Sequence, residues 1–457
     1  SLSLALIGVG HLVGITVGIA MIVGLVISFG VMLPLRTAGQ IPADGDLGDI
    51  VSGIFTSDVR FVGAGAMAVA AVWTLAKIAL PIARGVKEAL AATRARDEGA
   101  EVPVQERDLS MRMVIGVTLA SMLPIGLLLW LFVQDTPIAH HAVGMVVVSI
   151  LFVLLIGLAV AGVCGYMAGL IGASNSPISG VGILIVIAAA LLIKVVHGAQ
   201  APGQGNVLIA YTLFTAAVVF GVATISNDNL QDLKTGQLVG ATPWKQQVAL
   251  VIGVLFGSVI IPPVLQLLNT SFGFAGAPEA TGNALAAPQA ALLSSLAKGV
   301  FGGDLDWGLL GLGAAIGAVV VVIDEVLGLT TKNRVHLPPL AVGMGMYLPM
   351  GLTLIIPVGA VAGLLYDRWA AGTADPESSK RLSTLAATGL IVGESLFGVA
   401  LAGIVAAFGE EEPLAVVGPG FTTASEVLGA LVFAGATIGL YLWVKRLSVR
   451  ATARAGA

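Results

Sequence analysis

The chain carries little charge for its length. Only 11% of its 457 residues are Asp, Glu, Lys or Arg, whereas soluble domains carry roughly 25%. The net charge is −4, and the charges are dispersed, so nucleic acid is excluded as a partner. Cys164 is the single cysteine and lies inside an apolar run, which excludes an intramolecular disulfide and a cysteine-based metal site.

The motifs of several enzyme classes are also missing. We find no phosphate-binding glycine loop, no His/Glu spacing for zinc and no G-x-S-x-G turn. These absences argue against an ATP-driven pump and against a hydrolase, and nothing in the sequence calls for a cofactor or a metal. A membrane-embedded enzyme would need a nucleophile and a base at a readable spacing, and none is found.

What the chain does contain is apolar sequence. Its residues are 57% hydrophobic, with a mean hydropathy of +0.99. A bilayer core of about 30 Å requires about 20 apolar residues per helix, and runs of that length recur throughout. The sequence therefore predicts an all-α polytopic integral membrane protein with about eleven transmembrane helices and broken or re-entrant segments. We place the spans near 12–34, 61–83, 111–133, 142–168, 179–197, 207–225, 246–268, 307–328, 338–366, 383–408 and 427–445.

Basic residues between the spans predict how the chain is oriented. We expect a single transmembrane domain over 1–457, with a cytoplasmic loop at 84–110 that is rich in arginine. A second loop, 269–306, contains a short apolar segment that is interfacial or re-entrant. The basic tail after 445 falls on the cytoplasmic side only if 338–366 enters the membrane and returns. A single kinked helix over 338–366 is the alternative.

Glu394 is the first candidate for function. It lies near the middle of the apolar segment "AATGLIVGESLFGVALAG", and a carboxyl at that depth is costly unless it faces a cavity or a partner. Burial would raise its affinity for protons and let it carry one. The other interpretation is an acid that is hydrogen-bonded to a neighbouring helix.

The segment "GASNSPISGVG" is the second candidate. It lies between two apolar runs, and its proline removes a backbone donor while hydroxyls and an amide offer replacements. A broken helix of this kind exposes backbone groups to a ligand, although an ordinary turn fits the pattern equally well. We predict substrate binding by Ser174, Asn175, Ser176 and Ser179.

The third candidate is the polar run "SNDNLQDLK". Ser226 or Asn227 could cap a new helix, and acids in its first turn would then meet the positive end of the helix dipole. Asp228 and Asp232 at i, i+4 would place two carboxylates on one face, which requires a cation or a proton nearby. A solvated loop is the alternative. We predict proton coupling by Asp228 and a gate or helix cap formed by Asn227, Asn229, Gln231, Asp232 and Lys234.

The same run carries a resemblance. The stretch "NDNLQDLKTGQLVGATPWKQQ" resembles the signature of the oligopeptide transporter family, which includes the plant yellow-stripe-like branch. The stretches "SNSPISG", "LAAPQA", "LPPLAVGMGMYLP" and "GLIVGESL" are similar to family motifs as well, and the likeness extends from about residue 1 to 440. Family members have about sixteen spans, so the resemblance implies that an N-terminal part precedes this sequence.

The resemblance also implies a function. It predicts secondary active transport, with proton-coupled symport of oligopeptides or of metal chelates and other peptide-like small solutes, and no enzymatic activity. Gln289 and Tyr347 lie in the matching motifs and are further substrate-binding candidates. We expect residence in a bacterial cytoplasmic membrane with the C-terminus in the cytoplasm, and we leave a homo-oligomer open. A channel is the first alternative and a membrane-embedded enzyme the second.

Overall fold

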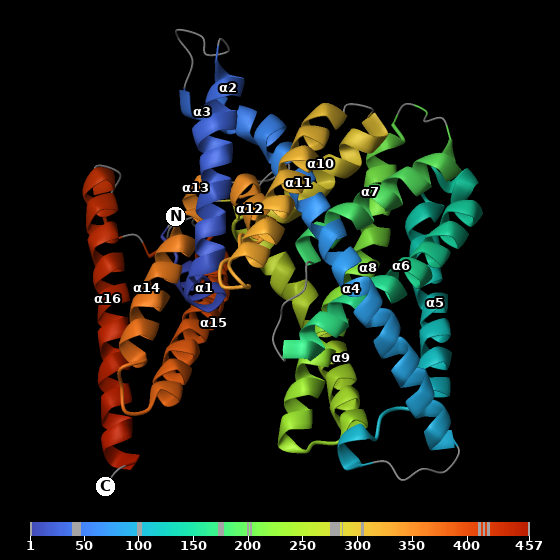
Figure 1. Cartoon of the computed structure of the whole chain (residues 1–457). Coiled ribbons are helices and arrows are strands. Elements are labelled where there is room, and N and C mark those ends of the chain that lie inside the picture. Colours follow the sequence, from blue (N-terminus) through green and yellow to red (C-terminus); the bar gives the residue numbers. More distant parts are fainter. Residues whose placement is uncertain are drawn as a thin grey trace. The chain divides into compact units, whose positions relative to one another are not determined.

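The structure is a computed structural model. It describes residues 2–38, 47–97, 103–171, 178–198, 201, 203–274, 284–285, 287–302, 306–409, 413–414, 416–417 and 421–455. Its helices are α1 Leu4–Leu25, α2 Leu33–Thr37, α3 Leu47–Ile54, α4 Arg60–Asp97, α5 Met111–Gln134, α6 Ala142–Ile171, α7 Ile178–His197, α8 Gly205–Val239, α9 Pro243–Ser271, α10 Pro288–Gly302, α11 Trp307–Thr330, α12 Pro339–Tyr347, α13 Met350–Thr353, α14 Ile355–Ala370, α15 Pro376–Phe408 and α16 Thr422–Ala455 (Figure 1).

Short helices of other types join these elements. They are the π-helices η1 Val26–Met32 and η2 Phe55–Val59 and the 3₁₀-helices η3 Val104–Glu106 and η4 Ala139–His141. The part of the chain that the structure describes contains no β-strand, only an isolated bridge between Phe274 and Leu285. The predicted all-α class is confirmed.

Eleven helical segments of the described residues are long and apolar enough to cross a membrane. Each of them overlaps one predicted span, because a bilayer sets the length of apolar sequence that a spanning helix needs. Several boundaries differ from prediction, among them the first segment, which begins at Leu4, and the ninth, which begins at Met350. Residues 84–97, expected in a loop, continue α4, and residues 226–239, expected as a separate element, continue α8.

The chain divides into two compact units. Unit 1 contains 1–66, 262–287 and 311–457, and unit 2 contains 67–261 and 288–310. Each is described on its own below.

Close helix packing at glycines forms the centre of unit 1. Helix α1 packs against α12, α14 and α15. A side chain at Gly10 would lie 2.0 Å from the Ile356 carbonyl oxygen, and one at Gly24 would lie 2.2 Å from that of Val342. Only glycine permits this approach, which membrane helices use to gain packing contacts.

Two membrane segments of unit 1 are interrupted. Within α1, Gly14 has φ 78° and ψ 174°, which breaks the helix between Val13 and Ile15. The predicted segment 338–366 is not one continuous helix: α12 ends at Tyr347, and Leu348 is extended before α13 begins. Helix α12 has nine residues and is about 14 Å long, too short to cross a bilayer.

In unit 2, helices α6, α7, α8 and α10 pack together. The ring of Phe220 on α8 lies over Gly182 on α7, where a Cβ would be 1.8 Å from the ring. A buried hydrogen bond from Tyr211 to Ser149 (3.0 Å) joins α8 to α6. Lys194 on α7 donates to the Val300 carbonyl of α10, which satisfies its ammonium group at the apolar interface.

Candidate functional site

Glu394 holds the beginning of α1. Its Oε1 accepts a hydrogen bond from the Ser3 hydroxyl (2.6 Å), and its Oε2 accepts one from the Ala5 backbone N–H (2.9 Å). The first N–H groups of a helix have no partner within the helix, and the dipole favours a negative charge there. The carboxylate of Glu394 therefore stabilises the first turn of α1 from the middle of α15.

A groove of about 680 Å³ in unit 1 has Glu394 in its wall. We call it the Glu394 groove. The groove is lined by glycines of α15 and α16, among them Gly389, Gly393 and Gly429. Leu2 and Phe397 also line it. The residue itself is exposed in the structure. The carboxylate is hydrogen-bonded to the neighbouring helix α1, as in the second interpretation made from the sequence. The burial expected in the first interpretation is not found, and the role of Glu394 as a proton carrier stays a prediction.

Tyr347 ends α12 at the break and is buried against an arginine. The Arg60 guanidinium donates to the Tyr347 hydroxyl (2.7 Å), and its carbon lies 4.8 Å from the ring centre. Arg60 is 8% exposed and Tyr347 is 1% exposed. A buried cation is costly unless it is hydrogen-bonded, so the tyrosine offsets the cost by its oxygen and by its ring.

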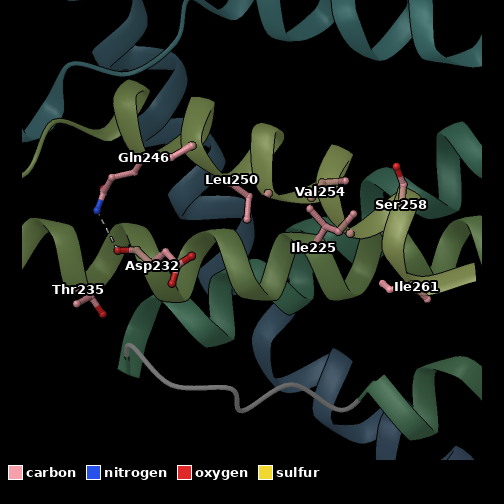
Figure 2. A pocket seen from close by; sticks show the side chains of 11 residues that line it. Ile225, Asp232, Thr235, Gln246, Leu250, Val254, Ser258 and Ile261 are labelled. Carbon is pink, nitrogen blue, oxygen red and sulfur yellow. Dashed lines mark hydrogen bonds between the residues drawn. The ribbon is translucent and has the colours of Figure 1, made fainter. Parts of the chain in front are cut away.

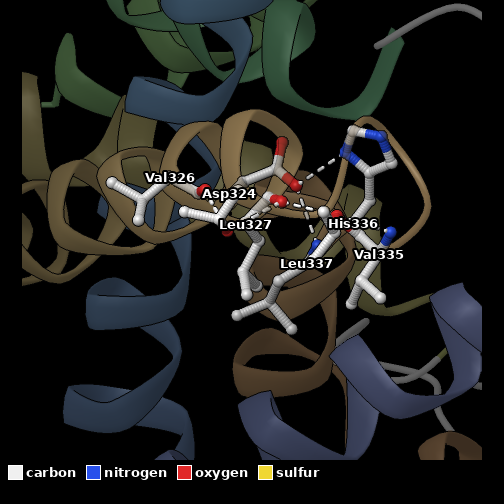
Figure 3. Close-up of polar contacts among 8 residues, drawn as sticks. Asp324, Val326, Leu327, Val335, His336 and Leu337 are labelled. Atoms are coloured by element: carbon white, nitrogen blue, oxygen red, sulfur yellow. Dashed lines mark hydrogen bonds and ion pairs between the residues drawn. The ribbon is translucent and has the colours of Figure 1, made fainter.

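A third polar cluster lies between α11 and α12 (Figure 3). Asp324 accepts from the Leu337 backbone N–H (2.8 Å), and the Nδ1 of His336 lies 3.3 Å from the same carboxylate oxygen. The Thr331 hydroxyl donates to Leu327 O (2.6 Å) and accepts from Val335 N (3.0 Å). These bonds fix the connection that leads into the interrupted segment.

The predicted polar run lies in the second half of α8, in unit 2. Its buried face meets α6: Ser226 donates to Ala161 O (2.7 Å), and Leu230 packs on Gly165. Asn227 is 1% exposed on the same side. Asp228 and Asp232 are exposed, as expected for residues at i, i+4 that share one helix face.

The other side of this run lines a groove of about 860 Å³ between α8 and α9, the α8–α9 groove (Figure 2). Asp232 and Thr235 contribute from α8, and Gln246 and Ser258 contribute from α9. The Gln246 amide donates to the Asp232 backbone oxygen (3.4 Å). A Cβ at Gly236 would lie 1.9 Å from the Gln246 amide nitrogen, so the glutamine side chain takes this position because Gly236 leaves it free.

The predicted cap at Ser226 or Asn227 is wrong. Helix α8 runs without a break from Gly205 to Val239 and ends at Gly240, which has φ 77°. No proline interrupts 205–239, and Asp, Asn and Gln are tolerated within a helix once tertiary packing holds it. Lys234 reaches Gln237 (3.1 Å). A role of the run as a gate remains a prediction, as do the roles of Asn229 and Gln231, which are half-buried.

The substrate-binding candidates fall in different parts of the chain. Ser174, Asn175 and Ser176 lie outside the described residues. Ser179 is in the first turn of α7, and Gln289 is exposed at the start of α10. Ser179 and Gln289 belong to unit 2, whereas Tyr347 and Glu394 belong to unit 1.

Sequence reasoning missed Arg60 and passed over His336. Arg60 stands next to the apolar run "FVGAGAMAVAA", where an arginine is usually assigned to the membrane surface. The glycines in the apolar run that follows Arg60 could have indicated its burial, because glycines in membrane helices are typical of close helix packing.

Comparison with known proteins identifies the family. The family model described as "OPT oligopeptide transporter protein" matches residues 1–405. The chain belongs to the OPT family. A Haemophilus influenzae protein named "Putative oligopeptide transporter" is 39% identical over 463 residues, which cover 97% of this chain and 72% of the relative.

More distant relatives of this OPT family member come from rice. One, named "Probable metal-nicotianamine transporter YSL10", is 29% identical over 204 residues, covering 44% of this chain and 28% of the relative. A second, YSL13, is 28% identical over 197 residues. No solved structure matches the chain. Since the family consists of transporters, the OPT protein is an integral membrane transporter of a small-molecule or peptide substrate, not an enzyme.

Proposed function

We propose that this OPT family member is a proton-coupled symporter of oligopeptides or of metal chelates. The observation that carries the proposal is the position of Glu394. Its carboxylate holds the first turn of α1, a helix that is interrupted at Gly14, and it lies in a groove. A titratable group that is hydrogen-bonded to one end of an interrupted membrane helix can couple its protonation to movement of that helix.

Protonation of Glu394 would weaken its hydrogen bonds to the first turn of α1. Both oxygens of Glu394 accept hydrogen bonds, and charge-assisted bonds are roughly twice as strong as neutral ones. A proton on the carboxyl removes the charge that the positive end of α1 favours. The piece of α1 before Gly14 is then freer to move about that glycine, whose backbone accepts conformations that other residues avoid.

The interrupted helices offer the second part of the mechanism. Secondary transporters bind substrates where membrane helices are broken, because the free backbone N–H and C=O groups there can replace water around a solute. The break between Tyr347 and α13 is such a place in unit 1. Tyr347 would supply a hydroxyl group to a peptide-like substrate at this break. Ser179 and Gln289 in the other unit stay separate candidates for binding substrate through amide and hydroxyl groups, as do Ser174, Asn175 and Ser176.

The polar run of α8 would act as a gate. Asp228 and Asp232 share one face, and Asp232 lines the α8–α9 groove. Two carboxylates at i, i+4 repel each other, and a bound proton or a nearby cation would relieve that repulsion. Asn227, Asn229, Gln231 and Lys234 complete this polar segment of α8.

The names of the relatives support a substrate class. The bacterial relative is named for oligopeptides and the rice relatives for metal-nicotianamine. Both kinds of ligand present carboxylates and amines, which hydroxyl and amide side chains bind without strong selectivity. We therefore propose oligopeptides and metal–nicotianamine chelates as the compounds to test.

The test is uptake into proteoliposomes with an imposed proton gradient. We expect Glu394→Gln to lose gradient-driven accumulation by about tenfold or more, because glutamine keeps the acceptor for Ala5 N but cannot take up a proton. Exchange of labelled substrate against unlabelled substrate should persist. The matched control is Glu377→Gln, an exposed acid in the first turn of the same helix, which should transport normally.

Unchanged gradient-driven uptake by Glu394→Gln would remove the coupling assignment. Absence of counterflow in the wild-type protein, with uptake intact, would favour a channel instead.

A further inference from the structure

Three of the five histidines gather at one end of unit 2. His140 and His141 form the last turn of η4, before α6, and His197 ends α7. The ring centres of His140 and His141 are 4.4 Å apart, those of His141 and His197 are 5.0 Å apart, and those of His140 and His197 are 5.9 Å apart. We call this group the histidine cluster.

A glutamine fixes the protonation of one ring. The side-chain oxygen of Gln204 accepts from the Ala201 backbone N–H (2.8 Å), and its amide donates to Pro137 O (2.9 Å). This assigns the oxygen and the nitrogen of the Gln204 amide. The oxygen lies 3.1 Å from His197 Nε2, so Nε2 carries the hydrogen and Nδ1 presents a lone pair.

That lone pair is buried and makes no hydrogen bond. His197 is 4% exposed, and its Nδ1 has no partner among the described residues. A buried acceptor without a donor costs about 1–3 kcal/mol. Histidine binds a metal ion as a neutral imidazole in which one nitrogen donates a hydrogen bond and the other has a lone pair without a hydrogen bond.

The spacing of the rings fits a common ion. With Zn–N distances of about 2.0–2.1 Å and tetrahedral geometry, the centres of three ligating imidazoles lie about 5 Å from one another. The three observed distances bracket this value. With the side chains as they stand in the structure, no group of three or more His, Cys, Asp or Glu among the described residues is placed to hold a metal ion. His140 and His141 are exposed, so rotation of their side chains can bring their nitrogens to the His197 side.

We propose that His140, His141 and His197 form a binding site for one divalent transition-metal ion of the Zn²⁺ type. Imidazole ligands suit Zn²⁺, Ni²⁺ and Cu²⁺ and do not suit Mg²⁺ or Ca²⁺. Three histidines leave a fourth position for water or for another donor. The proposal is independent of the proposed transport function.

The cluster is far from the polar run of α8. Gln204 directly precedes α8, and Asp232 follows 28 residues later, on the order of 40 Å along the helix axis. The metal site therefore belongs to the opposite end of unit 2 from the α8–α9 groove.

Calorimetric titration of the purified full chain with ZnCl₂ tests this site. We expect about one bound ion per chain. The variant His140→Ala/His141→Ala should bind at least tenfold more weakly, and because both side chains are exposed its fold should be kept. Gln204→Leu should weaken binding by about 10–100-fold, as loss of a partner behind a ligand does.

The matched control is His336→Ala, a histidine of unit 1 that contacts Asp324 instead. Its Zn²⁺ affinity should equal that of the wild type. A visible spectrum of tetrahedral Co²⁺ that is lost in His140→Ala/His141→Ala gives a second readout. Absence of Zn²⁺ binding, or equal affinity in all variants, would overturn the proposal.

Discussion

At the scale of single residues, the buried arginine next to the α12 break is the least expected feature. The guanidinium of Arg60 is planar and carries five N–H donors, so it needs several acceptors. Tyr347 supplies an oxygen and a ring face to it. The pair therefore couples the first residue of α4 to the last residue of α12.

Removal of the Tyr347 hydroxyl should be costly. Tyr347→Phe keeps the ring and deletes the acceptor at 2.7 Å from the Arg60 guanidinium. Leaving a buried charged donor without this acceptor should lower the free energy of unfolding by about 1–3 kcal/mol, measured as a lower melting temperature in detergent.

The control is Tyr166→Phe on α6, because Tyr166 is half-buried and makes no hydrogen bond within the described residues. Its melting temperature should stay within the error of the wild type. Equal melting of Tyr347→Phe and the wild type would show that the contact contributes nothing.

At the scale of elements, the two helix interruptions in unit 1 differ in whether the sequence predicts them. Pro349 predicts the break that follows α12, because proline lacks the N–H that would continue a helix. Gly14 gives no such signal, since it is one of 60 glycines. Most of these glycines serve close packing within continuous helices, and only tertiary structure distinguishes the two uses.

Substitution at Gly14 should strain α1. With φ 78° and ψ 174°, a conformation that essentially only glycine adopts, alanine there costs about 1–3 kcal/mol in backbone strain, although nothing lies within 4 Å of its position. Gly14→Ala should therefore melt at a lower temperature and transport more slowly, because the straightened helix loses its hinge.

Gly116→Ala on α5 is the matched control, since it also has open space around it but lies in a continuous helix. That change should raise stability by about 0.5–1 kcal/mol. If Gly14→Ala is stabilising as well, the break in α1 is not a feature of the native protein.

Helix α8 shows where counting apolar residues fails. The span was predicted to end at residue 225 because polar residues begin there. The helix continues for four more turns, because Ser226, Asn227 and Leu230 pack against α6 and hold the backbone in place. Polarity marks the end of the hydrocarbon region and not the end of a helix.

At the scale of the whole molecule, the eleven candidate spans of the described residues raise a question of topology. It is the side of the membrane on which the basic C-terminal tail lies. An odd number of full crossings places the two ends on opposite sides, whereas the positive-inside rule favours a cytoplasmic tail. Helix α12 is too short to cross alone, so the interrupted segment decides the topology. A homo-oligomer stays a prediction.

Labelling of single cysteines with a membrane-impermeant reagent resolves the orientation. The only native cysteine, Cys164, is buried and can be replaced by alanine as the background. We expect Gln105→Cys and Arg450→Cys to react only from the cytoplasmic side, and Asp135→Cys only from the outside, following the arginine distribution.

Asp135→Cys is the internal control, because all three positions are exposed and differ only in side. Reaction of position 450 from the outside would mean that the interrupted segment crosses the membrane as one full span.

The sequence alone determined the class of this protein, its eleven spans and its family, because apolar length and local motifs depend only on neighbouring residues. Tertiary structure decided which polar groups meet. Glu394 and the first turn of α1, Arg60 and Tyr347, and the histidine cluster each join residues that are distant in the chain or on different elements. Such contacts arise from the three-dimensional packing of helices around glycines, which no local pattern specifies.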